Sequence, residues 1–318
     1  MPDPNHPTID LAPIDLARFR GGNRGIPYVW TFRSGATGPH VLVNALTHGN
    51  EVCGAHALAR LLDDGLRPDR GTLTFGFANV AAYESFDPEY PFVSRFLDED
   101  FNRVWDAATL DGPRASRELE RARALRPVID EADHLLDLHS TELPQAAMLL
   151  AGTRGKNLAL ARAIGFPSHV VLDAGHKSGR RLRDYGKFDA PDHPGLSLLV
   201  ESGSHFERPS ATVALATTLL FLRHFGIVDD RAIERYGVTR PTSPQRVVKV
   251  TDAVTIKSDR FAFARGFRGF DVVAEAGTVI AEDDGEPVRT PYPDCVLVMP
   301  ARNPTKGLTA VRLGRSVP

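Results

Sequence analysis

Short apolar runs alternate with segments of helical periodicity over most of the chain, and this alternation constrains the fold more than any other feature. The runs have the length and composition of buried strands, at residues 28–32, 41–45, 72–78, 134–138, 148–151, 169–172 and 196–200. Apolar residues at helical spacing occupy residues 52–63, 116–132, 157–164 and 212–223. Because strands that alternate with helices form mostly parallel sheets, the sequence predicts an α/β fold with a mostly parallel mixed sheet covered by helices.

The pattern changes near residues 240–244, where the sequence Arg-Pro-Thr-Ser-Pro is typical of a linker. Beyond this point the helical periodicity gives way to short alternating runs that Gly and Pro interrupt. Such runs are typical of a small all-β domain. We therefore expect two domains, a larger α/β domain at residues 1–240 and a small β domain at residues 241–318.

Two long polar stretches, residues 79–113 and 173–193, interrupt the predicted α/β pattern. A loop of this length inside a compact domain is usually functional or contains unrecognised structure. The second stretch is rich in His and Arg.

Composition narrows the class of protein. The 318 residues are 42% hydrophobic and 25% charged with a net charge of −2, so nothing favours nucleic acid or an anionic membrane as a partner. No apolar run approaches the ~18 residues of a membrane span, and the N-terminal residues lack the pattern of a secretory signal. Cys53 and Cys295 are too few for a disulfide framework, which favours a reducing cytoplasm. The sequence leaves the oligomeric state open, homo-oligomers included.

Polar residues with metal-binding chemistry follow several predicted strands. His48 and Glu51 lie where the strand at 41–45 gives way to a helix, which is the usual ligand-binding edge of an open α/β sheet. An imidazole and a carboxylate at this spacing can converge on one cation, and a third ligand would complete a catalytic zinc site. His139 and Glu201 also follow predicted strands, so we expect them at the same edge. The alternative for each histidine is a hydrogen-bonded structural residue.

The segment at residues 94–103 has the chemistry of a substrate-binding loop. The guanidinium groups of Arg95 and Arg103 are planar forks suited to carboxylates, and Asn102 adds directional donors. Asp100 can fix the tautomer of a metal-binding histidine by accepting its second proton. The alternative is a solvated, charged loop without a role in binding.

Four motifs resemble, in order and spacing, those of the succinylglutamate desuccinylase/aspartoacylase family, a branch of the zinc carboxypeptidase fold. They are Thr47-His48-Gly49-Asn50-Glu51, Arg95 with Asp100-Phe101-Asn102-Arg103, Leu136-Asp137-Leu138-His139-Ser140-Thr141, and Glu201-Ser202-Gly203. The resemblance covers residues 40–205, and the trailing β region also fits the family's layout. Phe101 stands where the family usually has Leu, a packing change of little consequence.

The resemblance implies roles for the residues of these motifs. His48, Glu51 and His139 would bind one zinc ion per chain. Glu201 would be the general base, and Arg95 would polarise the scissile carbonyl group.

The same resemblance implies that Asn102 and Arg103 hold a substrate carboxylate, and that Asp100 is the partner of His48. No residue matches those with which aspartoacylase itself grips the acyl-group carboxylate; the candidates are Arg180, Arg181 and Arg183. Tyr292 is the candidate for a tyrosine that aspartoacylase contributes from its C-terminal domain. The identity of the acyl group stays open.

These residues predict a zinc-dependent hydrolase that cleaves the amide bond of an N-acyl amino acid or a similar small amide. The bond would be a C–N bond other than a peptide bond. The alternatives are a metallocarboxypeptidase that acts on peptides and a binding protein without catalytic activity on the same fold. The sequence contains no G-x-S-x-G, P-loop or H-E-x-x-H motif, which disfavours a serine hydrolase, a P-loop enzyme and a thermolysin-type protease.

Overall fold

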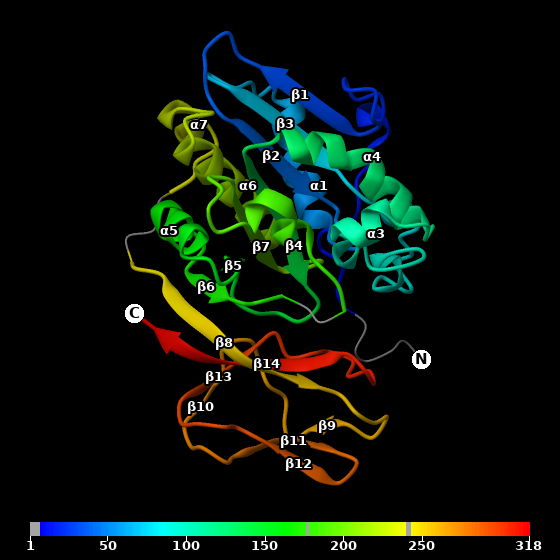
Figure 1. Ribbon diagram of the computed structural model, residues 1–318, viewed down its shortest axis with the longest axis vertical. Helices are drawn as coiled ribbons and strands as arrows, with labels where there is room; N and C mark the ends of the chain where they lie inside the picture. Colours follow the sequence, from blue (N-terminus) through cyan, green and yellow to red (C-terminus); the bar gives the residue numbers. More distant parts are fainter. Residues whose placement is uncertain (1–6, 176–177, 240–242) are drawn as a thin grey trace.

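A mixed sheet of eleven strands runs through the computed structural model, which describes residues 7–175, 178–239 and 243–318. Its order is β1-β3-β2-β4-β7-β5-β6-β8-β14-β13-β10 (Figure 1). The strands before the C-terminal region are β1 (Val29–Arg33), β2 (His40–Ala45), β3 (Thr72–Phe77), β4 (His134–Thr141), β5 (Met148–Leu150), β6 (His169–Leu172) and β7 (Leu196–Ser204).

Four neighbouring strands, β3, β2, β4 and β7, are parallel, so their carboxyl ends meet at one edge of the sheet. On either side of this group the pairing is antiparallel: β1 pairs with β3, and β5 pairs with β7. The register between β4 and β7 sets His139 directly opposite Glu201. This edge is therefore the place where the predicted site residues can meet.

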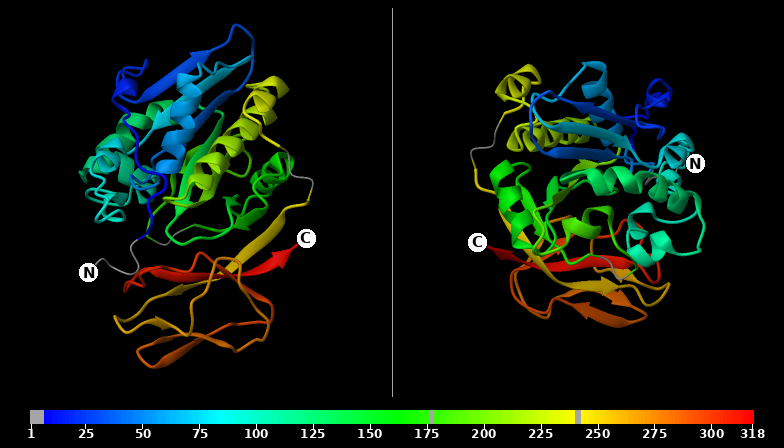
Figure 2. Two further views of the ribbon diagram at one scale, coloured as in Figure 1. Left: turned by 180° about the vertical axis from the view of Figure 1, so that it is seen from behind. Right: turned by 45° about the horizontal axis from the view of Figure 1, so that its top comes forward.

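Helices cover both faces of the sheet. The helices are α1 (Val52–Asp63), α2 (Val80–Glu84), α3 (Ala107–Asp111), α4 (Arg117–Glu131), α5 (Gly155–Ile164), α6 (Arg208–His224) and α7 (Asp230–Arg235). Helices α1 and α6 pack side by side on one face, and their apolar residues join those of the sheet in the largest core cluster (Figure 2, left). Helix α4 covers the opposite face over a second core cluster.

Helix α1 fixes the position of the chain just after β2. Its predicted and observed bounds coincide, because apolar residues at helical spacing extend over its whole length. A Cβ atom at Gly54 would lie 2.8 Å from the Ala45 side chain and 3.0 Å from that of Leu138, so the glycine lets the helix rest directly on the sheet. This close packing holds the turn at residues 46–51 against the carboxyl edge.

The C-terminal region is all β, as predicted. Its strands are β8 (Arg246–Thr255), β9 (Ala262–Phe263), β10 (Val272–Val273), β11 (Val279–Asp283), β12 (Glu286–Arg289), β13 (Cys295–Val298) and β14 (Thr309–Val317). Strands β12, β11 and β9 form a separate small sheet, whereas β8 pairs with β6 and extends the large one. The predicted fold class is confirmed. The two-domain division stays a prediction, and residues 240–242 of the expected linker lie outside the described residues.

The structure differs from the predicted elements in several places. Strand β4 continues to Thr141 instead of ending at residue 138, and helix α6 begins at Arg208 instead of residue 212. The stretch at residues 79–113 contains α2 and α3 as well as the 3-10 turns Val93–Arg95 and Phe101–Arg103. Helix α7 was not predicted, because six residues are too few to establish a helical period. Strand β7 continues to Ser204, beyond its apolar run, because its pairing with β4 extends that far. Among the described residues no helix is long and apolar enough to cross a membrane.

Candidate metal centre and active site

The turn after β2 is shaped by two backbone features. Leu46 has a φ of 60°, a left-handed conformation that costs a non-glycine residue about 1–3 kcal/mol and is often found at functional sites. A Cβ atom at Gly49 would collide with the carbonyl oxygen of Ser94, so only glycine allows this turn to touch the loop before Arg95. The Gly49 N–H also donates to the Arg95 carbonyl oxygen at 3.0 Å. Two distant segments are thereby joined at the start of the site.

His48, Glu51 and His139 form a compact buried cluster. Glu51 Oε1 lies 2.7 Å from His48 Nδ1, and Glu51 Oε2 lies 2.7 Å from His139 Nδ1. One candidate ligand atom from each residue lies within 4.8 Å of the others. Glu51 is itself buried, and each of its two carboxylate oxygens faces one imidazole nitrogen. Two imidazole nitrogens and a carboxylate in this arrangement fit a zinc ion with a further position open to solvent or substrate.

A carboxylate holds the outer nitrogen of each histidine. Asp100 Oδ1 lies 3.0 Å from His48 Nε2, and Asp137 Oδ2 lies 2.8 Å from His139 Nε2. These contacts leave both Nδ1 atoms facing Glu51. Carboxylates in this position fix the tautomer and orientation of metal-binding histidines, so both fit a metal centre.

The Asp137 carboxylate was not among the predicted site residues. Its other oxygen accepts hydrogen bonds from Thr47 Oγ1 and Asn44 Nδ2, each at 2.8 Å. The signal in the sequence was the spacing, since residues 137 and 139 lie on the same face of a strand. The predicted strand ended at residue 138 and left that relation unused.

Electrostatics favour a cation between these groups. Burial alone would lower the pKa of His139, but the Asp137 and Glu51 carboxylates raise it well above its usual value. Burial alone would raise the pKa of Glu51, but His48 and His139 hold it well below its usual value. The Glu51 carboxylate therefore stays ionised and stabilises positive charge in the cluster.

Glu201 lies on β7, opposite His139. Its Oε2 atom is buried and makes no hydrogen bond. Burial and the like charge of Glu51 raise the pKa of Glu201 to about 8. A carboxyl group near a candidate metal centre, with its pKa raised toward neutrality, can both accept and donate a proton.

The loop between β3 and α4 brings a second set of predicted residues to the cluster. Arg95 Nη2 lies 2.9 Å from His48 Nε2 and 3.3 Å from Asp100 Oδ2, and Arg95 Nη1 lies 3.4 Å from Glu51 Oε1. Arg103 Nη2 lies 3.7 Å from Asp100 Oδ2. Arg95 and Arg103 therefore share one carboxylate, and both guanidinium groups lie beside the candidate metal centre.

The Asn102 side chain forms a structural hydrogen bond with the polar loop after β6. Its Oδ1 atom accepts a hydrogen bond from the Leu182 N–H at 2.8 Å. Burial lowers the pKa of Arg103 to about 10; Asp100 opposes the shift, while nearby Arg95, Arg181 and Arg312 add to it. The cationic groups around Arg103 make this place attractive to an anion.

The candidates for an acyl-group contact are engaged elsewhere. Arg181 and Arg183 are buried and form ion pairs with Asp184, at 2.6 Å each. Arg180 pairs with Asp189 at 3.3 Å. The Tyr292 hydroxyl lies 2.5 Å from Thr251 Oγ1, within the C-terminal core.

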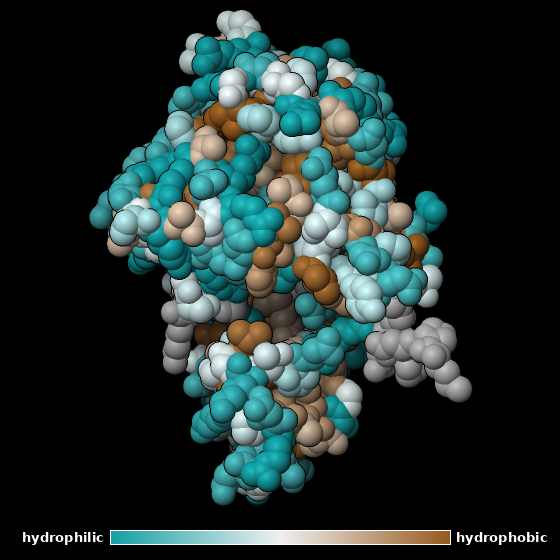
Figure 3. Space-filling model, turned by 90° about the vertical axis from the view of Figure 1, so that its right-hand side faces the viewer, coloured by the Kyte–Doolittle hydropathy of each residue, from teal (hydrophilic) through white to brown (hydrophobic). Residues whose placement is uncertain are grey.

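The C-terminal region faces the site edge. In Figure 1, β8 and β14 cross below the carboxyl end of β4. Figure 3 shows the surface hollowed where the C-terminal strands meet the rest of the molecule. Arg312 on β14 is buried and interacts electrostatically with Glu201.

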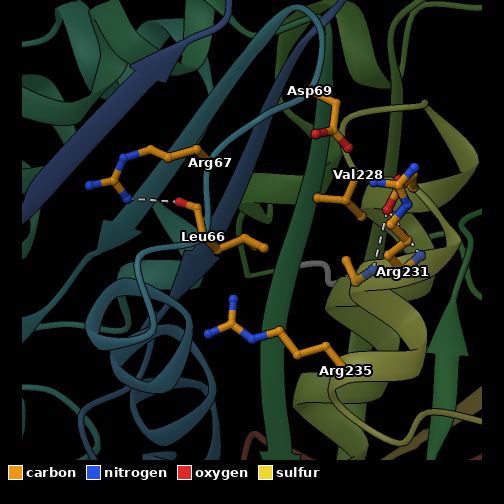
Figure 4. A pocket seen from close by; sticks show the side chains of 8 residues that line it. Leu66, Arg67, Asp69, Val228, Arg231 and Arg235 are labelled. Carbon is orange, nitrogen blue, oxygen red and sulfur yellow. Dashed lines mark hydrogen bonds and ion pairs between the residues drawn. The ribbon is translucent and has the colours of Figure 1, made fainter.

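A separate surface cavity of about 200 Å³ lies at the other end of the sheet, between the chain before β3 and helix α7 (Figure 4). Arginines line it, but Figure 4 shows that Arg67, Arg231 and Arg235 do not converge on one point. Each is already engaged: Arg67 with the Leu66 carbonyl, Arg235 with the Asp64 carbonyl, and Arg231 with Asp229. This cavity is not part of the candidate site.

The fold and the His-Glu-His cluster define an α/β protein with a candidate metal centre at the carboxyl edge of its sheet. The model of the succinylglutamate desuccinylase/aspartoacylase catalytic domain matches residues 37–213, more than half of the chain. The chain therefore belongs to the succinylglutamate desuccinylase/aspartoacylase family, whose members are deacylating hydrolases. The matched region contains every candidate site residue from His48 to Glu201.

Solved structures share the fold. Succinylglutamate desuccinylase from Vibrio cholerae has a TM-score of 0.68 at 18% identity, with 92% of this chain and 86% of that chain covered. The product-bound ectoine utilization protein EutE (DoeB) from Ruegeria pomeroyi has a TM-score of 0.64 at 17% identity, with 90% and 88% covered. Murine aminoacylase 3 has a TM-score of 0.61 at 19% identity, with 89% and 97% covered. No curated protein matches the sequence.

Proposed function

We propose that this chain is a zinc-dependent hydrolase that cleaves the amide bond of an N-acyl amino acid or a similar small amide. The observation that carries the proposal is the convergence of His48, Glu51 and His139, with ligand atoms within 4.8 Å of one another, beside Glu201. Membership of a deacylase family supports the small-amide substrate over the peptide substrate of a metallocarboxypeptidase.

In this proposal, His48, Glu51 and His139 hold one zinc ion per chain. Zinc bound there supplies a Lewis acid that polarises a carbonyl group and lowers the pKa of water toward ~7. Asp100 and Asp137 keep the two imidazoles in the tautomer that presents Nδ1 to the ion.

Glu201 is the proposed proton carrier. As the water oxygen bonds to the carbonyl carbon, Glu201 accepts a proton from the water. When the C–N bond breaks, Glu201 gives that proton to the leaving nitrogen, so that an amine is released. The second proton of the water stays on the new carboxyl group and is then lost to solvent, which leaves a carboxylate. General acid–base catalysis of this kind contributes ~10²–10⁴-fold in rate.

Arg95, Asn102 and Arg103 are proposed to bind the substrate. Arg95 lies beside the cluster and would donate to the carbonyl oxygen as negative charge develops there, a contact worth ~3–4 kcal/mol. Arg103, with Asn102, would bind the substrate carboxylate, and a bidentate contact would orient the amide toward Glu201.

We also propose that the chain acts on its substrate in the cytoplasm, and that residues 1–240 and 241–318 are separate domains. Cys53 and Cys295 are free and buried, which fits a reducing compartment. A small β domain placed over the carboxyl edge would favour small substrates, in agreement with the hollow in Figure 3.

A hydrolysis screen tests the proposal. Zinc-loaded protein is incubated with N-acetyl, N-succinyl and N-formyl amino acids. In parallel it is incubated with peptides from which a carboxypeptidase would remove the C-terminal residue. We expect release of the free amino acid from at least one acyl class, faster than cleavage of any peptide. Preferred cleavage of peptides would make the chain a metallocarboxypeptidase. Zinc binding without hydrolysis of any substrate would make it a binding protein.

A further inference from the structure

Glu118, in the first turn of α4, is completely buried, with 0% of its surface exposed. It belongs to none of the motifs that carry the proposed function. Within the described part of the chain no ion pair includes its carboxylate, although a buried charge is normally paired with a cation. Such a group needs several hydrogen-bond donors to be tolerated.

Those donors come from the loop that carries the substrate-binding residues. Glu118 Oε1 accepts hydrogen bonds from the Leu97 N–H at 2.7 Å and from Asn79 Nδ2 at 3.1 Å. Glu118 Oε2 accepts from the Asp98 N–H at 3.0 Å and from the Glu99 N–H at 3.3 Å. Three consecutive backbone N–H groups therefore converge on one carboxylate, an arrangement that suits an anion.

The contact between Glu118 and these N–H groups matters because residues 97–99 lie between two groups of the candidate site. Residues 97–99 form no helix or strand, and they connect Arg95 to Asp100. Arg95 lies beside Glu51, and Asp100 holds the outer nitrogen of His48. A shift of residues 97–99 would therefore move both groups away from the candidate metal centre.

Helix α4 is suited to hold the Glu118 carboxylate in place. Its N-terminus carries partial positive charge, which stabilises a carboxylate in the first turn. Ser116 caps the helix by accepting from the Leu119 N–H, and its hydroxyl also donates to Glu99 at 2.5 Å. Arg117 pairs with Asp98 at 2.5 Å. The helix thus grips the loop through consecutive residues, of which only Glu118 is fully buried.

We propose that Glu118 is a positioning residue that anchors residues 97–99 and thereby sets Arg95 and Asp100 against the metal centre and Arg103 toward the substrate. This inference rests on the proposed function for its effect on catalysis. Its effect on the loop and on metal affinity does not depend on which substrate is cleaved.

The variant Glu118→Gln tests this role with little change in size. Each carboxylate oxygen accepts two donors, so an NH₂ group in either orientation faces two N–H groups that it cannot satisfy. We expect the zinc dissociation constant to rise 10–100-fold, since Asp100 no longer orients His48. The preference in kcat/KM for a free-carboxylate substrate over its amidated analogue should fall at least ~10-fold, since Arg103 loses its position.

The matched control is Glu120→Gln, an exposed glutamate in the same helical turn, which should leave both quantities unchanged. A Glu118→Gln variant that is less stable but keeps wild-type zinc affinity and carboxylate preference would show a merely structural role and overturn the proposal.

Hydrogen exchange of the wild-type protein provides a test that needs no folded variant and no known substrate. The amides of Leu97, Asp98 and Glu99 should be protected although they lie outside regular secondary structure. Exchange at the rate of a free loop would overturn the proposal. Protected amides in a protein that hydrolyses none of the screened substrates would uphold the anchor while refuting the proposed function.

Discussion

Two buried carboxyl groups at the candidate site, Glu51 and Glu201, have pKa values displaced in opposite directions. Burial acts on both and raises both pKa values, but His48 and His139 bring that of Glu51 well below its usual value. Glu201 has the like charge of Glu51 nearby, and its pKa rises to about 8. Environments that separate two carboxyl pKa values are typical of sites that assign them different tasks. Here the arrangement suits Glu51 as a ligand and Glu201 as a proton carrier.

Glu201→Gln should separate these two tasks. The amide cannot accept the proton of water, so we expect kcat to fall by ~10²–10⁴-fold while zinc content by elemental analysis stays near one ion per chain. The control is His139→Ala, which removes a proposed ligand and should reduce the zinc content itself. Substantial turnover by Glu201→Gln would mean that another group carries the proton.

Asp137→Asn should weaken metal binding although this residue would not touch the ion. An amide oxygen accepts a weaker hydrogen bond from the His139 Nε2–H than a carboxylate does, so the zinc dissociation constant should rise ~10–100-fold in a chelator competition. A matched comparison is Asp133→Asn at the opposite end of the strand, beside the His40 N–H. Equal zinc affinities in wild type and Asp137→Asn would contradict the orienting role.

At the residue scale, the sequence predicted which side chains gather but not how they are held. The types and spacing of His48, Glu51 and His139 indicated a metal site. The role of Glu118 depends on contacts between helix and loop that no local pattern encodes. The contact of Asp137 with His139 does follow from their spacing, but only for a strand that continues past residue 138. Tyr292 had the right chemistry for a substrate contact, but its hydroxyl is bound to Thr251 in the C-terminal core.

At the scale of elements, the bounds of a helix or strand are predictable where an apolar pattern defines them, and not where pairing or capping does. Helix α1 was predicted to its last residue because an apolar face defines it. Strand β7 was predicted too short because pairing with β4, rather than hydropathy, carries it past Val200 to Ser204. The six-residue α7 depends on Asp229, whose side chain accepts from the first N–H groups of the helix. Elements defined by tertiary contacts or caps were the ones missed.

Strand β4 begins with a histidine that should make stability depend on pH. The His134 ring stacks on Phe225 with centroids 3.9 Å apart, and its Nδ1 atom is buried without a hydrogen bond. Burial lowers the pKa of His134 to about 4, so the unfolded chain binds the proton more readily than the folded one. Stability from this group is therefore complete above pH ~6.5 and is lost as the pH falls toward 4.

Urea unfolding of the metal-free protein at pH 7 and pH 5 measures this effect. The loss attributable to His134 should be about 2 kcal/mol at pH 5, and His134→Gln should lose less stability than wild type by roughly that amount. His56→Gln provides the comparison, since His56 is half-buried on α1 and its ring is bound to the Ala12 carbonyl oxygen. Equal losses in wild type and His134→Gln would place the acid sensitivity elsewhere.

At the scale of the whole molecule, a buried chain of charges joins the C-terminal strands to the polar loop after β6. Arg312 Nε on β14 lies 3.2 Å from Asp173 Oδ2, and the same oxygen lies 3.1 Å from Arg181 Nη1. Arg181 continues to Asp184 at 2.6 Å. The loop also contacts the segment at residues 102–105, since Trp105 N–H donates to the Arg180 carbonyl oxygen at 3.2 Å. The C-terminal region is thus connected to the proposed substrate-binding residues.

This connection predicts energetic coupling between the two regions. Arg312→Met leaves the buried Asp173 with one cation fewer. Asp173→Asn leaves Arg312 and Arg181 without the carboxylate that they share. Each variant should lower the free energy of unfolding by about 1–3 kcal/mol. The double variant should lose less than the sum, with a coupling energy of roughly 1–3 kcal/mol in urea unfolding. Lys249→Met, on the exposed face of β8, should show no coupling to Asp173→Asn.

Additive losses for Arg312 and Asp173 would mean that the ion pair contributes nothing to holding the C-terminal strands against the loop. A measured coupling would show that the two regions, predicted from sequence as separate domains, stabilise each other through a buried contact at the edge of the site.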